Sequence, residues 1–216
     1  MESLRGLDNL REVSSLALEA NQRLPNLSGL EGLVRVGDLL VARNYVMTDL
    51  SGLEGVTTLG DVEIRGNPEL RSLEALRQVE AVGGTLEIRD NPSLETLSGL
   101  NGVSTVGEDL LVVWNPKMQS LEGLEQLTTV GRRLRVQSNG SLRSLDGAEA
   151  VREVGEDLMI VGNPSLVEVS AMHGVQRVGE SLWVEDNPTL PEAAAEALTA
   201  AIPEIGGSVF VRRNGD

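Results

Sequence analysis

Apolar residues recur along this chain at two alternating spacings. After Asn91 the first spacing is three residues, with apolar side chains at Leu94, Leu97, Leu100, Val103 and Val106. A glycine and a short turn follow, and the spacing then falls to two, at Leu110 and Val112. The same succession runs through the whole sequence, so the chain is built from repeats of one unit.

An asparagine closes each unit and defines the length of the repeat. Consecutive members lie 23 or 24 residues apart, at Asn21, Asn44, Asn67, Asn91, Asn115, Asn139, Asn163 and Asn187. A fixed period of this length is typical of a solenoid, in which each unit buries its apolar edge against its neighbours. The sequence therefore predicts a single repeat domain over residues 1–216, with residues 188–216 as its C-terminal cap.

The period-two part of each unit predicts a β-strand whose alternate side chains point inward. Because one such strand occurs in each unit and always in the same direction, neighbouring copies can pair only in parallel, about 4.8 Å apart. About nine strands of this kind would form a ribbon about 40 Å long. We therefore expect a mainly β protein, a parallel β-solenoid of about nine rungs.

The period-three segment is less determined than the strand. It is compatible with a chain of turns, a short 3₁₀ helix, or a second strand that ends at the Val-Gly pair. Extended or irregular backbone is favoured, because glycine in a helix interior costs about 1 kcal/mol relative to alanine and one recurs here, at Gly29, Gly52, Gly99, Gly123 and Gly147. We expect a positive φ at the glycine that ends the segment, found at Gly37, Gly60, Gly83, Gly107, Gly131, Gly155 and Gly179.

The asparagine column has two interpretations. Eight aligned amides could form a polar catalytic row, but a structural role is favoured. An amide at the exit of each strand can bond backbone groups of its own turn, which would otherwise be buried without partners. A proline, which fixes the turn, follows in five units, at Pro68, Pro92, Pro116, Pro164 and Pro188. We expect an inward ladder of asparagines that supports the fold.

The repeat also resembles a known family. The pattern Leu-x-Gly-Leu-x-x-Val-x-x-Val-Gly-x-x-Leu-x-Val-x-x-Asn-Pro-x-Leu runs from Leu97 to Met118, with Met in place of the last Leu. It resembles the receptor L domain, the leucine-rich-repeat-like right-handed β-helix of growth-factor and insulin receptor ectodomains, which also occurs in bacterial surface proteins. The resemblance implies a right-handed solenoid. Family members often carry a cysteine after the last Asn-Pro-x-Leu, where this chain has Pro191-Glu192-Ala193.

The final unit is longer and changes character. The alanine-rich stretch from Pro191 to Ala201 predicts a helix that stops before Pro203, with Thr189 as its cap. Its buried side is expected to carry Ala194, Ala197, Leu198 and Ala201. The last strand is expected at residues 208–211. This helix would act as a lid on the apolar core.

Outward strand positions are not dictated by the repeat, so apolar residues there carry information. In the middle of the ribbon the usual Glu and Arg side chains give way to apolar ones, and both tryptophans lie there. Exposed Trp, Met and Arg on a flat sheet are typical of the centre of a protein interface. The candidate anchors are Leu111, Val113, Trp114, Met159, Val161 and Trp183, with Arg135 and Glu185 setting the register.

The predicted function is therefore a non-enzymatic scaffold that binds another protein, or a second copy of itself, through this sheet face. In the receptors that the chain resembles, the broad sheet face takes part in ligand contact. The same residues are also compatible with an incidental apolar patch. Two other functions remain open. A carbohydrate-binding or carbohydrate-active β-helix would hold carboxylates beside aromatic platforms in a groove, whereas a structural spacer or designed scaffold would bind nothing.

Composition narrows the choice of partners. The net charge of −15 opposes approach to nucleic acid or anionic lipid. The chain has no cysteine, which excludes disulfides, and no apolar span long enough to cross a bilayer. Lys117 is the only lysine beside many arginines, which favours a bacterial source rich in G and C. The resemblance suggests a cell-surface or secreted protein, while the lack of cysteine and of an export signal permits a cytoplasmic one.

The sequence offers few of the residues that catalytic or metal-binding sites require. His173 is the only histidine, so neither a usual zinc site nor a Ser-His-Asp triad is expected. No glycine-rich phosphate loop opens a helix, so no cofactor is expected. An acidic stripe could hold Ca²⁺, but a solvated acidic edge is favoured, at Asp38, Asp61, Glu108, Asp109, Glu156, Asp157 and Glu180.

Overall fold

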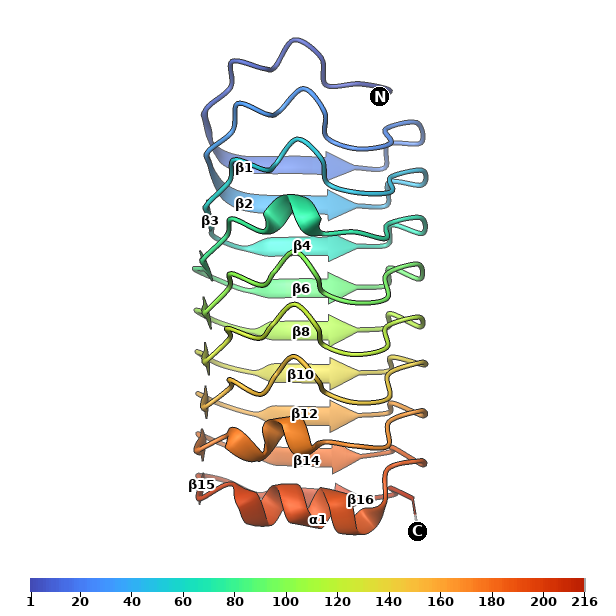
Figure 1. Ribbon diagram of the computed structural model, residues 1–216, viewed down its shortest axis with the longest axis vertical. Coiled ribbons are helices and arrows are strands. Elements are labelled where there is room, and N and C mark those ends of the chain that lie inside the picture. Colours follow the sequence, from blue (N-terminus) through green and yellow to red (C-terminus); the bar gives the residue numbers. More distant parts are fainter. Residues whose placement is uncertain (216) are drawn as a thin grey trace.

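The computed structural model describes residues 1–215, and these residues form a parallel β-solenoid with the N-terminus at one end and one α-helix at the other (Figure 1). One strand of each turn builds the main ladder, and these strands are β1 (Glu12–Glu19), β2 (Arg35–Ala42), β4 (Val62–Arg65), β6 (Leu86–Arg89), β8 (Leu110–Val113), β10 (Leu134–Gln137), β12 (Leu158–Val161), β14 (Leu182–Glu185) and β16 (Val209–Arg212). All neighbours pair in parallel. The predicted solenoid with about nine rungs is confirmed.

A second ladder of two-residue strands runs along another side of the solenoid. Its members are β3 (Thr58–Leu59), β5 (Ala81–Val82), β7 (Thr105–Val106), β9 (Thr129–Val130), β11 (Glu153–Val154), β13 (Arg177–Val178) and β15 (Glu204–Ile205). These strands also pair in parallel. Most of them occupy the end of the period-three segment, immediately before a glycine. Of the conformations considered for that segment, a second strand at the Val-Gly pair is therefore present.

The rest of the period-three segment consists of turns, except in two units where it forms a short 3₁₀ helix. These helices are η1 (Glu74–Leu76) and η2 (Ser170–Gly174). Other units have a glycine at this point, as at Gly52 and Gly123, where φ is 114° and 112°. The two helical units carry Ala75 and Ala171 instead. Alanine strongly disfavours such φ values, so those two units adopt a different local backbone.

The expectation of a positive φ at the glycine after the second strand is wrong. Positive φ is found at the mid-segment glycines, but not at Gly107 or Gly131. Here the requirement for glycine comes from stacking. A Cβ on Gly131 would lie 2.0 Å from the carbonyl oxygen of Gly107 in the turn before it, far inside the contact distance. The corner needs a small residue because two backbones approach closely, not because the chain turns left-handed.

The core is a stack of aliphatic rungs that both spacings fill. The period-three residues Leu94, Leu97 and Val103 are completely buried, as are Leu86 and Ile88 on β6. Because equivalent residues stack in register from turn to turn, each aliphatic side chain packs against its counterparts above and below. The sheet's outer face is left to residues that the core does not constrain.

The C-terminal end is covered by α1 (Glu192–Ala201), which packs on η2 and β16. Pro191 occupies the N-cap position, so the prediction of Thr189 as the cap is wrong. The Thr189 hydroxyl instead donates to the carbonyl oxygen of Pro164 at 2.5 Å. The helix buries Ala195 and Leu198, while Ala197, expected inside, is exposed. No helix among residues 1–215 combines the length and apolar character that crossing a membrane requires.

Candidate functional site

The asparagine column forms a buried ladder between turns. From Asn44 to Asn187 each amide is inaccessible to solvent, and Asn21 at the first turn is half-buried. The Oδ1 of Asn115 accepts a hydrogen bond from the backbone N–H of Asn91 at 3.0 Å. Its Nδ2 donates to the carbonyl oxygens of Ile88 at 2.9 Å and Val113 at 3.2 Å. Only the bond to Val113 lies within its own turn, so the amides mainly join one turn to the next.

The residue before each ladder asparagine lies in the left-handed region of the backbone. Glycine fills the position at Gly66 and Gly162, but Trp114 holds it with φ of 57°. A bulky side chain is rare at positive φ. The hydrogen bonds of Asn115 hold the backbone here, and Trp114 at the strand exit is 46% exposed.

The outer face of the main ladder carries two columns of side chains in register. From β8 to β16 the first column reads Leu111, Arg135, Met159, Trp183 and Phe210. The second reads Val113, Gln137, Val161, Glu185 and Arg212. On β4 and β6 the same columns hold Glu and Arg. We call the outer positions of β8 to β14 the apolar face, since most of them carry apolar side chains, namely Leu111, Val113, Met159, Val161 and Trp183.

The sequence-selected anchors do not all lie together. Met159, Val161 and Trp183 are half-buried neighbours on β12 and β14. Leu111 is half-buried two strands away on β8, and Val113 is 9% exposed. Trp114 lies at the edge of the face, three strands away from Trp183, or about 14 Å along the stack. The two tryptophans are thus separate contact points rather than one cluster.

Two aromatic contacts add residues that the sequence analysis did not select. The ring of Trp183 stacks on Phe210, with centroids 3.8 Å apart and an interplanar angle of 19°. The guanidinium carbon of Arg89 lies 4.3 Å from the centre of the Trp114 ring. Phe210 shares the outward column with Trp183, so the column itself was the signal that could have identified it.

Arg135 and Glu185 differ in how their charges are neutralised. Glu185 is 6% exposed, and its carboxylate accepts from Arg212 Nε at 2.5 Å and lies 3.8 Å from Arg213. Its charge is therefore engaged within the chain. Arg135 has no ion pair among residues 1–215, and its Nε is buried without a hydrogen-bond partner. The Oε1 of Gln137, two residues along the same strand, is also buried and without a partner.

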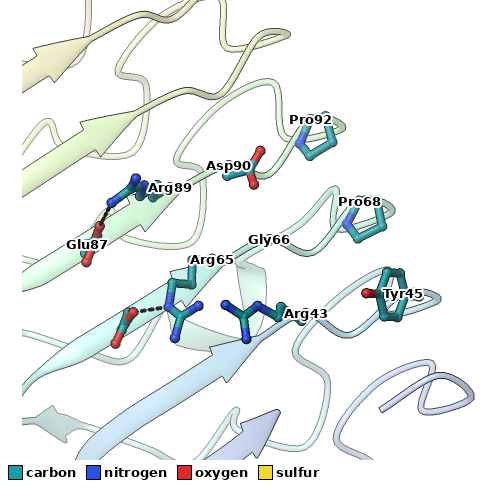
Figure 2. A pocket seen from close by; sticks show the side chains of 10 residues that line it. Arg43, Tyr45, Arg65, Gly66, Pro68, Glu87, Arg89, Asp90 and Pro92 are labelled. Atoms are coloured by element: carbon teal, nitrogen blue, oxygen red, sulfur yellow. Dashed lines mark hydrogen bonds and ion pairs between the residues drawn. The ribbon is translucent and has the colours of Figure 1, made fainter. Parts of the chain in front are cut away.

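A separate hollow of about 570 Å³ lies at the strand exits of the N-terminal half. Figure 2 shows Arg43 and Arg65 from neighbouring turns directed into it, with Tyr45, Pro68 and Pro92 around its rim. Gly66 has no side chain to fill the space. The carboxylates of Glu63, Glu87 and Asp90 also line the hollow, so it combines guanidinium groups, carboxylates and an aromatic ring that is 54% exposed, Tyr45.

Several residues of the acidic stripe join neighbouring turns. The Oδ1 atoms of Asp61, Asp109 and Asp157 accept backbone N–H groups from the following turn at 2.8 to 3.0 Å. Burial raises the pKa of Asp109, but hydrogen bonds and charge from Arg133 outweigh it and hold this pKa below its ordinary value. Over residues 1–215 no group of three or more histidine, aspartate or glutamate side chains could hold a metal ion. His173 is exposed on η2.

Comparison with known proteins assigns this chain to no family. A scan against protein-family models found no match to the chain, and a search of curated proteins found none either.

Proposed function

We propose that this chain is a protein-binding solenoid whose apolar face contacts a partner, and the proposal includes no catalytic step. The observation that carries it is the change on the outer sheet face between β6 and β8. Glu87 and Arg89 give way there to Leu111 and Val113 in the same two columns. Since the core does not constrain these positions, a group of apolar side chains on an otherwise strongly charged body is typical of an interaction site.

The size of the face favours a loop or an extended segment of another protein as the occupant. Four strands about 4.8 Å apart, each with about four residues, give a flat area of about 250 Å². A stable dimer buries about 800 Å² on each partner. A second copy docked through this face alone would therefore form only a weak contact, and the charge of −15 on each copy would oppose it further.

The family resemblance supports the same function. The solenoid is compatible with a receptor L domain-like protein, and in that family the broad sheet face takes part in ligand contact. A cell-surface or secreted setting would follow from membership. The right-handed winding and the bacterial source belong to this proposal as well.

The test compares binding by two single variants. A library of random twelve-residue peptides displayed on phage is selected on the immobilised protein, and the enriched peptides are then measured by calorimetry. Met159→Ser removes an apolar side chain from the face, whereas Val167→Ser removes an exposed valine from elsewhere on the solenoid. Peptides that lose affinity for the first variant and keep it for the second support the proposal. Equal binding to both contradicts it.

A second candidate function is carbohydrate binding in the hollow of Figure 2. What favours it is the combination of Tyr45 with carboxylates and guanidinium groups, since aromatic rings stack on sugars while these charged groups bond hydroxyls. A glycan array probed with the protein tests it. Binding that Tyr45→Ala removes and Met159→Ser leaves intact would place the ligand in the hollow and not on the apolar face.

A further inference from the structure

We propose that Arg135 makes the apolar face selective for a segment that carries a carboxylate between apolar side chains. This inference rests on the proposed protein-binding function and deepens it. Arg135 lies in the first outward column, between Leu111 on one neighbouring strand and Met159 on the other. It is the one guanidinium group within the apolar face, so a partner that binds there must bring a negative charge to neutralise it.

The rest of the sheet shows how an outward arginine is normally neutralised in this protein. On β4 the guanidinium of Arg65 pairs with Glu63, two residues before it on the same face. On β6 the same spacing brings Arg89 to 3.6 Å from Glu87. On β10 the arginine stands in the first column and Gln137 in the second, so the position that could supply a carboxylate holds a neutral amide.

The neighbouring strands supply no carboxylate to Arg135 either. Its register partners are Leu111 and Met159, and those of Gln137 are Val113 and Val161. Within residues 1–215 the buried Nε of Arg135 and the buried Oε1 of Gln137 have no hydrogen-bond partner. A buried polar group without a partner costs free energy, so the side chain of Arg135 lacks the compensation that Arg65 and Arg89 have. A bound carboxylate that reaches the outer nitrogens of the guanidinium group would supply the missing counter-charge.

The guanidinium group of Arg135, which has no ion pair within residues 1–215, defines the chemistry of the ligand. A carboxylate accepts two parallel hydrogen bonds from a guanidinium group, in a geometry that a lysine cannot offer. Leu111 and Met159 flank the guanidinium with apolar surface, so the residues on either side of the acid should be apolar.

The overall charge places a further condition on the partner. A body with a net charge of −15 repels acidic proteins at long range. The protein that carries this segment should therefore be neutral or basic as a whole, with its acidic residue confined to the contact. A second copy of this chain fits poorly, because it is acidic throughout.

The experiment uses peptides selected from the random twelve-residue library on the whole wild-type chain. We expect the enriched peptides to share an aspartate or glutamate flanked by apolar residues. Gln137→Glu places a carboxylate two residues from Arg135, in the spacing of Glu63 and Arg65, and should weaken binding about tenfold or more. Gln126→Glu adds the same charge at an exposed position outside the strands and should change affinity little.

Arg135→Met provides the second and sharper comparison. It should also weaken binding about tenfold, although it makes the face more apolar. Changing the acidic residue of the peptide to its amide should remove most of the difference between wild type and Arg135→Met. Circular dichroism and thermal unfolding of each variant check that it is folded.

The outcomes separate this inference from the function on which it rests. Peptides that need Met159 but bind Arg135→Met as well as or better than wild type would refute the role of Arg135 and leave the binding face intact. A library that yields no peptide dependent on Met159 would count against both. A wild-type dimer in sedimentation that Gln137→Glu dissociates would identify a second copy as the source of the carboxylate, and would overturn the choice of another protein.

Discussion

The guanidinium carbon of Arg89 lies 4.3 Å from the centre of the Trp114 ring, one turn further along the solenoid. Arg89 pairs in register with Val113, the residue before Trp114, and also approaches Glu87 at 3.6 Å. A cation over an indole face is an attractive contact. The contact joins Trp114 to the charged turns, so this pair marks the edge between the charged and apolar parts of the sheet.

Two substitutions of Trp114 should distinguish the contribution of its side chain to stability from that of its backbone conformation. Trp114→Gly should leave the free energy of unfolding within about 1 kcal/mol of wild type, because glycine adopts positive φ without strain. Trp114→Val should lower it by about 1–2 kcal/mol, since a β-branched residue is disfavoured there. Urea denaturation measures both. Equal losses in the two variants would mean that the Arg89 contact, not the backbone, determines stability at this position.

Removing one amide from the ladder should destabilise the solenoid. Asn115→Ala eliminates hydrogen bonds to Asn91, Ile88 and Val113 in the buried interior, and we expect a loss of about 1–3 kcal/mol in the free energy of unfolding. Chemical denaturation measures the change, and Asn9→Ala at an exposed position is the control. A loss no larger than that of the control would contradict a supporting role for the ladder.

Two glycines at equivalent corners should respond differently to the same substitution. A Cβ on Gly131 would lie 2.0 Å from the Gly107 carbonyl oxygen, whereas one on Gly83 would lie 3.6 Å from the Leu59 carbonyl oxygen. Gly131→Ala should therefore lower the free energy of unfolding by about 2 kcal/mol or more, and Gly83→Ala by less than about 1 kcal/mol. Thermal unfolding of the two variants side by side provides the measurement. Similar melting temperatures would argue against close stacking at this corner.

Asp109 should contribute to the loss of stability in acid. Burial raises its pKa, but hydrogen bonds and charge from Arg133 lower the pKa by more, so the folded-state value lies below the unfolded one. The stabilisation is thus present above the unfolded pKa of about 3.9 and is lost as the pH falls through the folded value. Asp109→Asn keeps an acceptor for the Arg133 N–H and should reduce the dependence of stability on pH below about pH 4.

The control for this prediction is Asp90→Asn, which changes an exposed aspartate. Urea denaturation between neutral and acidic pH gives the dependence for each variant. If Asp109→Asn follows the wild-type curve in acid while Asp90→Asn departs from it, the assignment to Asp109 is wrong.

The sequence was sufficient to predict the strands and their inward residues because stacking imposes one register on every turn. Leu86, Leu110 and Leu134 could be aligned on paper and lie in one column in space. The local backbone was less predictable. Gly131 and Gly123 look alike in the sequence, yet glycine is required for different reasons. Gly131 is required by its close contact with the neighbouring turn, and Gly123 by its positive φ.

The candidate site was predicted only in part, because its distinguishing property depends on what surrounds a side chain in three dimensions. The outward position of Arg135 followed from the spacing. That its Nε is buried and lacks an acceptor depends on the packing of Leu111 and Met159 beside it. The cap shows the same limit, since the helix was predicted but the Thr189 contact with Pro164 crosses between turns.

Because the ladder asparagines are regularly spaced, whole turns of the solenoid can be exchanged, and their order determines which charged side chains become neighbours. Excision of residues 92–115 would remove one complete turn and bring β6 directly against β10. Glu87 would then replace Leu111 as the neighbour of Arg135 and supply the counter-charge from inside the protein. Rearranging whole turns would in this way remove or create a binding site without changing any side chain that remains.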